Sequence, residues 1–314
     1  MSARRALAAV ALALGAACRA PAAPRFPAGH EIVVCGERVP IDAPVVLWTE
    51  EPFYDATLER PRFASSGESG KRYRPGREPA GAELAAKVEE HGWTRALLAE
   101  QIDLFVLHYD ACGTSRACFR VLQDERKLSV HFLLDLDGTI YQTLDLREQA
   151  WHARAANARS IGVEIAQVGA VPEKERARLA KTYEWREDGT RIVLTREAEE
   201  GLRQSGFVAR PARRELLAGT IHGEALVQHD FTPEQYESLA ALAAALARVF
   251  PRIELEAPRD GSGRVRMDAL SDEEEAAFHG VVGHWHLQRD KIDPGPAFDW
   301  EGFLARARRR VGVL

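Results

Sequence analysis

The residues best suited to chemistry lie near the carboxyl end of the chain, between Gly283 and Trp300. Within a short stretch, His284, Lys291 and Asp293 supply an imidazole, an amine and a carboxylate. The β-branched run before His284 predicts a buried strand that ends there, and the Pro-Gly-Pro sequence after Asp293 restricts the backbone. We interpret His284 and Asp293 as two zinc ligands and Lys291 as a cation facing the reacting group. A catalytic zinc ion takes three protein ligands and keeps one open position, so a third ligand is expected elsewhere.

His108 follows an apolar strand predicted over residues 104–107, and it therefore has the same strand-end position as His284. A single histidine at a strand end is more often structural than a metal ligand. The residues alone leave the role of His108 open.

Glu164 is the best candidate for a general base. It lies in the strand predicted over residues 160–165, whose other residues are those of a buried strand. A carboxylate there costs several kcal/mol unless it meets a cation or a polarised water molecule.

The pattern of apolar residues indicates an α/β protein. Asp137-Gly138 lies between two short β-type runs and predicts a hairpin. Thr232 and Pro233 are typical of a helix start, and the alanine-rich run that follows predicts a helix to Phe250. We divide the chain into residues 1–17, a signal peptide; residues 18–80, a tether and extended N-terminal arm; and residues 81–314, one domain with an insertion at about 166–230.

The first residues predict export. Arg4-Arg5 is followed by the apolar run Ala6–Ala17, which is too short to span a membrane as a mature helix. Cys18 ends a segment that is similar to a bacterial lipoprotein signal, so we expect a lipid on Cys18; cleavage near residues 20–23 is the alternative. The expected location is the periplasm, with the chain anchored to the membrane through its N-terminal lipid.

The chain has 314 residues, of which 46% are hydrophobic, so it can bury a full core. Its formal charge of −5 and the lack of a basic stripe argue against a nucleic-acid partner. The oligomeric state is not indicated.

Cys112 and Cys118 flank the short loop 113–117. In an exported chain a disulfide between them is the leading interpretation, and a pair of buried thiols is the alternative. Their spacing does not favour metal binding. Cys35 has no obvious partner if Cys18 carries a lipid.

Taken in order, five motifs between residues 103 and 304 resemble the zinc-dependent N-acetylmuramoyl-L-alanine amidases (amidase type 2), a superfamily that includes the peptidoglycan recognition proteins. The motifs are Val106-Leu107-His108, His131-Phe132 with Asp137-Gly138, Ala150-Trp151-His152-Ala153, Ile161-Gly162-Val163-Glu164-Ile165, and Gly283-His284 with Lys291, Asp293, Pro294 and Gly295.

This resemblance implies a central mixed β-sheet flanked by helices, with one Zn²⁺ ion bound at the strand ends by His108, His284 and Asp293. It implies that Glu164 is the catalytic acid and base and that Lys291 stabilises the oxyanion. The implied substrate is peptidoglycan or a muropeptide, cut between N-acetylmuramic acid and L-alanine.

The resemblance also bears on neighbouring residues. Val130 takes the place of a tyrosine that is catalytic in phage and animal members, so Glu164 is expected to act alone. Cys112 and Cys118 match the short-loop disulfide of peptidoglycan recognition proteins. The candidates for substrate contact are Trp151, His152 and Asn157.

The remaining histidines are less favoured as metal ligands. His286 is an alternative ligand, because it follows His284 by two residues. His152 is expected to hydrogen bond to a metal ligand or to contact the substrate, and His131 is expected to be a core histidine or to hydrogen bond to a ligand. Loop or surface positions are expected for His30, His91, His222, His229 and His279.

Two other functions compete with an amidase. A non-catalytic peptidoglycan-binding protein of the same fold is expected to lack a ligand or the acid and base, whereas this chain has candidates for every role. A zinc peptidase acting within the stem peptide is disfavoured, because the H-E-x-x-H helix is absent from the sequence.

Overall fold

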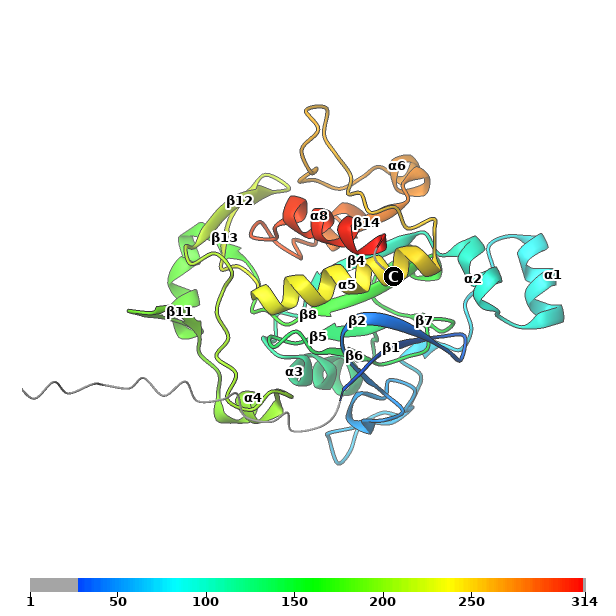
Figure 1. Ribbon diagram of the computed structural model, residues 1–314, viewed down its shortest axis with the longest axis horizontal. Coiled ribbons are helices and arrows are strands. Elements are labelled where there is room, and N and C mark those ends of the chain that lie inside the picture. Colours follow the sequence, from blue (N-terminus) through cyan, green and yellow to red (C-terminus); the bar gives the residue numbers. More distant parts are fainter. Residues whose placement is uncertain (1–27, 313–314) are drawn as a thin grey trace, which may run out of the picture.

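A seven-stranded mixed sheet forms the centre of the structure, a computed structural model that describes residues 28–312 (Figure 1). Its strands are β1 (Gly29–Val34), β2 (Glu37–Leu47), β4 (Leu104–Tyr109), β5 (Phe132–Leu134), β6 (Ile140–Gln142), β8 (Ser160–Ile165) and β14 (Gly280–Gly283). The strand order is β1-β2-β6-β5-β8-β4-β14. β5, β8, β4 and β14 run parallel to one another, whereas β6 pairs antiparallel with β5. The mixed sheet confirms the predicted fold class.

The described part of the chain has eight α-helices, of which α5 and α8 cover one face of the sheet and α3 lies on the other. They are α1 (Ala82–His91), α2 (Arg95–Gln101), α3 (Ser115–Arg120), α4 (Arg196–Gly201), α5 (Pro233–Val249), α6 (Asp272–Ala277), α7 (His284–Leu287) and α8 (Trp300–Val311). A π-helical turn continues α3, and the short 3-10 helices are Pro52–Tyr54, Arg154–Ala158 and Glu173–Lys181.

Alternation along β5 shows how the two faces are packed. Phe132 and Leu134 belong to the apolar core that also contains α5, whereas Leu133 between them packs with Phe119 of α3. Figure 1 shows α5 and α8 together across one face of the sheet and α3 on the other. Because both faces are buried, the central strands are mostly apolar, as is typical of parallel strands.

Helix α5 begins where the sequence predicts it. The hydroxyl of Thr232 accepts a hydrogen bond from the backbone of Gln235 at 3.1 Å, and the Gln235 side chain accepts one from the backbone of Thr232 at 2.9 Å. This reciprocal capping satisfies two donors that a helix start leaves free.

The insertion has its own small sheets beside the central one. β9 (Val171–Pro172), β13 (Glu224–Gln228) and β12 (Leu217–Ile221) form one of them, and β10 (Tyr183–Arg186) forms a hairpin with β11 (Gly189–Ile192). In Figure 1 the insertion flanks one side of the molecule.

The N-terminal part contributes more to the sheet than an extended arm would. β1 and β2 pair as a hairpin, and β2 runs parallel to β6, so residues 29–47 form one edge of the central sheet. Further along, β3 (Tyr73–Arg74) pairs with β7 (Gln149–Ala150). The predicted signal peptide and the predicted lipid site at Cys18 lie outside the described residues. Within residues 28–312, the helices are too short or too polar to cross a membrane.

Candidate functional site

The candidate site is built on three neighbouring parallel strands, β8, β4 and β14. Because parallel strands end at the same edge of a sheet, side chains at their carboxyl ends meet there. His108 lies near the end of β4 and is paired in register with Glu164 of β8. His284 is the first residue after β14, at the start of α7.

His108, His284 and Asp293 converge at this edge. The Nδ1 atoms of His108 and His284 are 3.0 Å apart, and each lies 3.0 Å from Oδ2 of Asp293. All three residues are at least 92% buried, with exposed fractions of 2%, 8% and 8%. Among the described residues they form a cluster that could hold a metal ion.

The donor set fits a zinc ion. Two imidazole nitrogens and one carboxylate oxygen are ordinary zinc ligands, and bonds of about 2.0–2.1 Å in a tetrahedron separate ligand atoms by about 3.3 Å. The observed triangle is close to this spacing. If both ring nitrogens donate to Asp293, the 3.0 Å contact between them brings two donors together, whereas a cation between the three atoms satisfies all of them.

The protonation states of the cluster suit metal binding as well. Burial, followed by the effect of the nearby His284 ring, lowers the pKa of His108 to about 4. Burial alone would raise the pKa of Asp293, but the attraction of His284 and the hydrogen bonds from both histidines outweigh burial and hold that pKa well below its usual value. At neutral pH the cluster therefore offers a neutral imidazole and an ionised carboxylate, as metal coordination requires.

The outer nitrogens of both histidines are also held in place. Nε2 of His108 lies 3.1 Å from Nδ1 of His152, and Nε2 of His152 lies 3.3 Å from the Ser160 hydroxyl. Nε2 of His284 lies 2.7 Å from the amide of Gln288, one helical turn later. Such contacts fix the orientation and tautomer of metal-binding histidines.

Gly162 makes room for the His152 ring, which leads to a prediction. A Cβ atom at this position would lie 2.6 Å from two atoms of that ring. We expect Gly162→Ala to displace His152, to release His108, and to destabilise the fold by about 1–3 kcal/mol through overpacking. Thermal unfolding and metal titration of the purified variant measure the two effects. A variant with wild-type metal affinity would show that His152 does not orient His108.

Glu164 and Lys291 line the same cavity as the cluster, a space of about 670 Å³. Oε2 of Glu164 is buried and has no hydrogen-bond partner among the described residues. Burial, followed by the negative charge of Asp293, raises the pKa of Glu164 well above its usual value. Lys291 is about one-third exposed, and its Nζ lies 3.9 Å from a carboxylate oxygen of Asp290.

The loop that carries Lys291 and Asp293 is braced by the insertion. His222, in the turn between β12 and β13, places its Nε2 3.1 Å from the backbone oxygen of Lys291. Gln228 of β13 donates to the backbone oxygen of Pro294 at 3.0 Å. Gly295 has φ +89° and leaves no space for a side chain against Gln228.

These supports were not found from the sequence. The sequence predicts a loop or surface position for His222, and His222 does lie in a turn, but its contact with the Lys291 backbone is not predicted. The sequence does not single out Gln288 or Gln228. The spacing of four residues between His284 and Gln288 was the available signal, because residues so spaced lie on the same face of a helix.

His286 does not point to the metal cluster. Its Nδ1 accepts a hydrogen bond from the backbone of Gly283 at 2.9 Å, and its Nε2 lies 2.8 Å from the backbone oxygen of Arg266. Both nitrogens are occupied, so the alternative ligand role is wrong. His284 begins a helix, and a helix does not keep residues two apart on one face.

The candidates for substrate contact have different positions. Trp151, His152 and Asn157 all line the cavity. Asn157 also accepts hydrogen bonds from the backbones of His152 and Ala153, at 3.0 and 2.6 Å. Asn157 therefore shapes the loop that presents the other two. Val130 is a buried core residue.

Cys112 and Cys118 are free cysteines in this structure, as is Cys35. The side chain of Cys112 hydrogen bonds with that of Cys118, and this contact and burial raise the pKa of the Cys118 thiol well above its usual value. In this structure Cys112 and Cys118 are therefore two thiols in contact with each other, which is the alternative to a disulfide. The disulfide stays a prediction.

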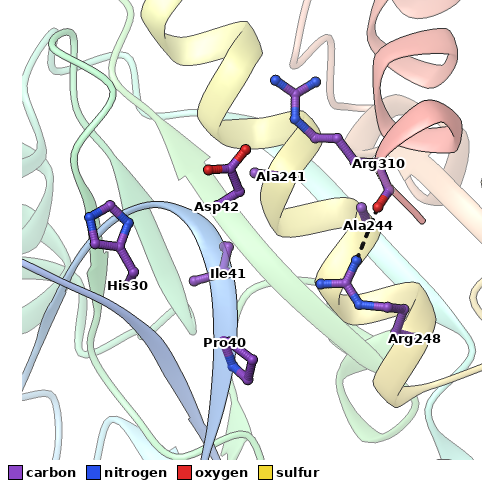
Figure 2. A pocket seen from close by; sticks show the side chains of 8 residues that line it. All are labelled: His30, Pro40, Ile41, Asp42, Ala241, Ala244, Arg248 and Arg310. Carbon is purple, nitrogen blue, oxygen red and sulfur yellow. Dashed lines mark hydrogen bonds between the residues drawn. The ribbon is translucent and has the colours of Figure 1, made fainter. Parts of the chain in front are cut away.

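A second cavity lies away from the cluster, between β2 and the helices α5 and α8 (Figure 2). Its volume is about 310 Å³, and its floor is made by alanines of α5. The residues around it are His30, Pro40, Ile41, Asp42, Ala241, Ala244, Arg248 and Arg310. Figure 2 shows these side chains spread around the opening, with Arg248 bonded to the backbone of Arg310, so they do not converge on one point.

Comparison with known proteins gives one family. The model described as N-acetylmuramoyl-L-alanine amidase matches residues 98–296. A search of curated proteins found no match.

Solved structures with similarity to the chain include amidases and a recognition protein. A selenomethionine derivative of AmpD is 21% identical, with 66% of this chain and 86% of that chain covered and a TM-score of 0.33. AmiD from E. coli, in complex with anhydro-N-acetylmuramic acid-L-Ala-D-gamma-Glu-L-Lys, is 18% identical, with 66% of this chain but only 57% of that chain covered and a TM-score of 0.38. A Drosophila PGRP-LB variant in complex with tracheal cytotoxin is 13% identical, with 82% and 91% covered and a TM-score of 0.33.

Proposed function

Because the chain belongs to the N-acetylmuramoyl-L-alanine amidase family, whose model spans residues 98–296, we propose that it is a zinc-dependent peptidoglycan amidase. The bond cut is the amide between the lactyl group of N-acetylmuramic acid and L-alanine of the stem peptide. The observation that carries this proposal is the triangle of His108, His284 and Asp293 with Glu164 on the next strand.

The zinc ion would be held by His108 Nδ1, His284 Nδ1 and Asp293 Oδ2. When bound, it supplies Lewis acidity, which lowers the pKa of a water molecule toward about 7 and polarises the amide carbonyl. The outer contacts of both histidines orient the two rings so that their Nδ1 atoms would be available to hold the ion.

Glu164 acts as the general base and then as the general acid. Its unpaired, partly buried carboxylate takes a proton from the attacking water and delivers it to the leaving amine of L-alanine. Burial that raises its pKa makes it a stronger base than an exposed carboxylate, and a nearby divalent cation keeps it ionised at neutral pH.

Lys291 stabilises the negative charge that develops on the carbonyl oxygen. Its ammonium is a partly exposed point charge in the lining of the cavity, and its backbone is held by His222. Electrostatic stabilisation of this kind is commonly the largest contribution to acyl-transfer catalysis.

The substrate class is a muramic acid carrying a stem peptide, of which L-alanine, γ-linked D-glutamate and a diamino acid are typical. A γ-linked glutamate leaves its α-carboxylate free, so such a peptide is anionic. We also propose export and anchoring through a lipid on Cys18, as the sequence predicts.

Mass spectrometry of muropeptide digests tests the proposal. The expected products are the free muramic-acid sugar and an intact stem peptide, formed by the purified protein and not formed after chelation. Shortened stem peptides would indicate a peptidase, and binding without any product would indicate a non-catalytic binding protein.

A further inference from the structure

A groove of about 630 Å³ lies between α3 and the insertion, on the side of α3 that faces away from the metal cluster. Arg116 and Arg120 of α3 line it, whereas Cys118 and Val121 line the cavity of the cluster. Cys112, at the start of the intervening loop, lines both spaces. The groove therefore adjoins the site where the scissile amide would lie.

The groove carries three cations without counter-ions. Arg116, Arg120 and Lys181 all line it, and within residues 28–312 none of them forms an ion pair. The acidic residue that lines it, Glu197, also forms no ion pair in that part of the chain. The groove thus has an excess of positive charge available to a ligand, whereas many other arginines of the protein are paired.

Arg116 is held in position although it has no acidic partner. Its guanidinium carbon lies 5.2 Å from the centre of the Phe53 ring and 5.9 Å from that of Phe63. Its aliphatic part is packed against α4, because a Cβ atom on Gly201 would lie 3.2 Å from Arg116 Cδ. A guanidinium fixed in this way loses little conformational entropy when it binds a carboxylate.

From this arrangement we propose that the groove is a subsite for the distal, carboxylate-bearing part of the stem peptide, with Arg116 as its main anchor. The proposal rests on the proposed function. An extended peptide advances about 3.3 Å per residue, so its third and later residues lie about 10 Å or more from the scissile amide. Such residues leave the cavity of the cluster and pass Cys112 into the groove, where their carboxylates meet the three cations.

Kinetics with two substrates test the subsite. Muropeptides with a two-residue stem and with a five-residue stem are compared on the wild type, Arg116→Gln and Lys181→Gln. For the longer stem we expect Arg116→Gln to raise KM about tenfold with kcat unchanged, because one charge-assisted pair is lost. For the shorter stem we expect less than a twofold change. An equal rise in KM for both stems would overturn the subsite.

Direct binding separates this proposal from the amidase itself. Isothermal titration calorimetry with the free stem pentapeptide is expected to show about tenfold weaker binding to Arg116→Gln and tighter binding to Glu197→Gln. Arg309→Gln on α8 removes the same charge from a distant exposed position and should bind as the wild type does. If the wild-type protein binds the peptide but cuts no muropeptide, the proposed amidase activity is refuted and the proposed subsite still stands.

If Arg116→Gln binds the pentapeptide as tightly as the wild type in this titration, the groove is not a subsite for the stem peptide. Lys181 is exposed, so Lys181→Gln provides a variant that folds even if Arg116→Gln does not, and it should weaken pentapeptide binding in the same direction. Unchanged binding by Lys181→Gln and unfolding of Arg116→Gln would together count against the proposal.

Discussion

Replacement of Glu164 by glutamine is expected to slow amide hydrolysis by about 10²- to 10⁴-fold, the usual contribution of a positioned general base. Glutamine keeps the shape of the side chain but cannot accept a proton at neutral pH. Because burial already favours the uncharged form of Glu164, the neutral amide should not destabilise the fold. Initial rates of stem-peptide release measure the loss, and thermal unfolding and metal content should match the wild type.

Glu125 provides the control for this substitution. It lines the same cavity but is exposed, and it lies on the π-helical turn after α3 rather than beside His108. Glu125→Gln removes the same charge and should change kcat by less than twofold. If Glu164→Gln releases stem peptide at the wild-type rate, or if both variants slow it equally, then Glu164 is not the base.

Much of this site can be predicted from the places where apolar strands end in the sequence. His108, Glu164 and His284 each come at or near the end of an apolar run, and apolar runs of this length predict buried parallel strands. Parallel neighbours bring such ends to one edge, so the convergence of the three residues was predictable. The order of the strands in the sheet was not predictable. Hydrogen bonding between β4, β8 and β14 joins segments that lie far apart in the sequence.

The turn between β1 and β2, at the edge of the sheet, has a sequence signal that predicts a hairpin. Cys35 and Gly36 have φ values of +52° and +79°, as the central residues of a tight hairpin turn require. A glycine in such a turn, between two β-type runs, could have indicated that β1 and β2 pair. The cysteine obscured it, because a residue with a side chain seldom adopts positive φ. Asp145 compensates by accepting both backbone N–H groups of the turn at 2.7 Å.

The supports of the metal cluster were harder to predict. His222 and Gln228 come from the insertion and act on the backbone of the Lys291 to Pro294 loop, and backbone contacts leave no pattern in side-chain spacing. The sequence predicts either contact with the substrate or orientation of a metal ligand for His152, and its 3.1 Å contact with His108 favours orientation of the ligand.

Asp293→Ala is expected to weaken zinc binding by at least about 100-fold, since it removes one of three proposed ligands and the negative charge that offsets the ion. As isolated, the variant should contain little zinc and show background hydrolysis. Metal analysis after gel filtration and initial rates are the measurements. Asp290→Ala is the matched control, because it removes a carboxylate from the same loop at an exposed position and should retain the metal.

Zinc titration separates a ligand from a catalytic base. Chelated wild-type protein should regain its full rate when about one equivalent of zinc is added. His108 and His284 remain in Asp293→Ala, so activity should return in part, but only at much higher zinc concentrations. Glu164→Gln should bind zinc normally and stay slow at every concentration. If Asp293→Ala instead keeps its zinc and its rate, the carboxylate is not a ligand, and the 3.0 Å contacts with both histidines have only a structural role.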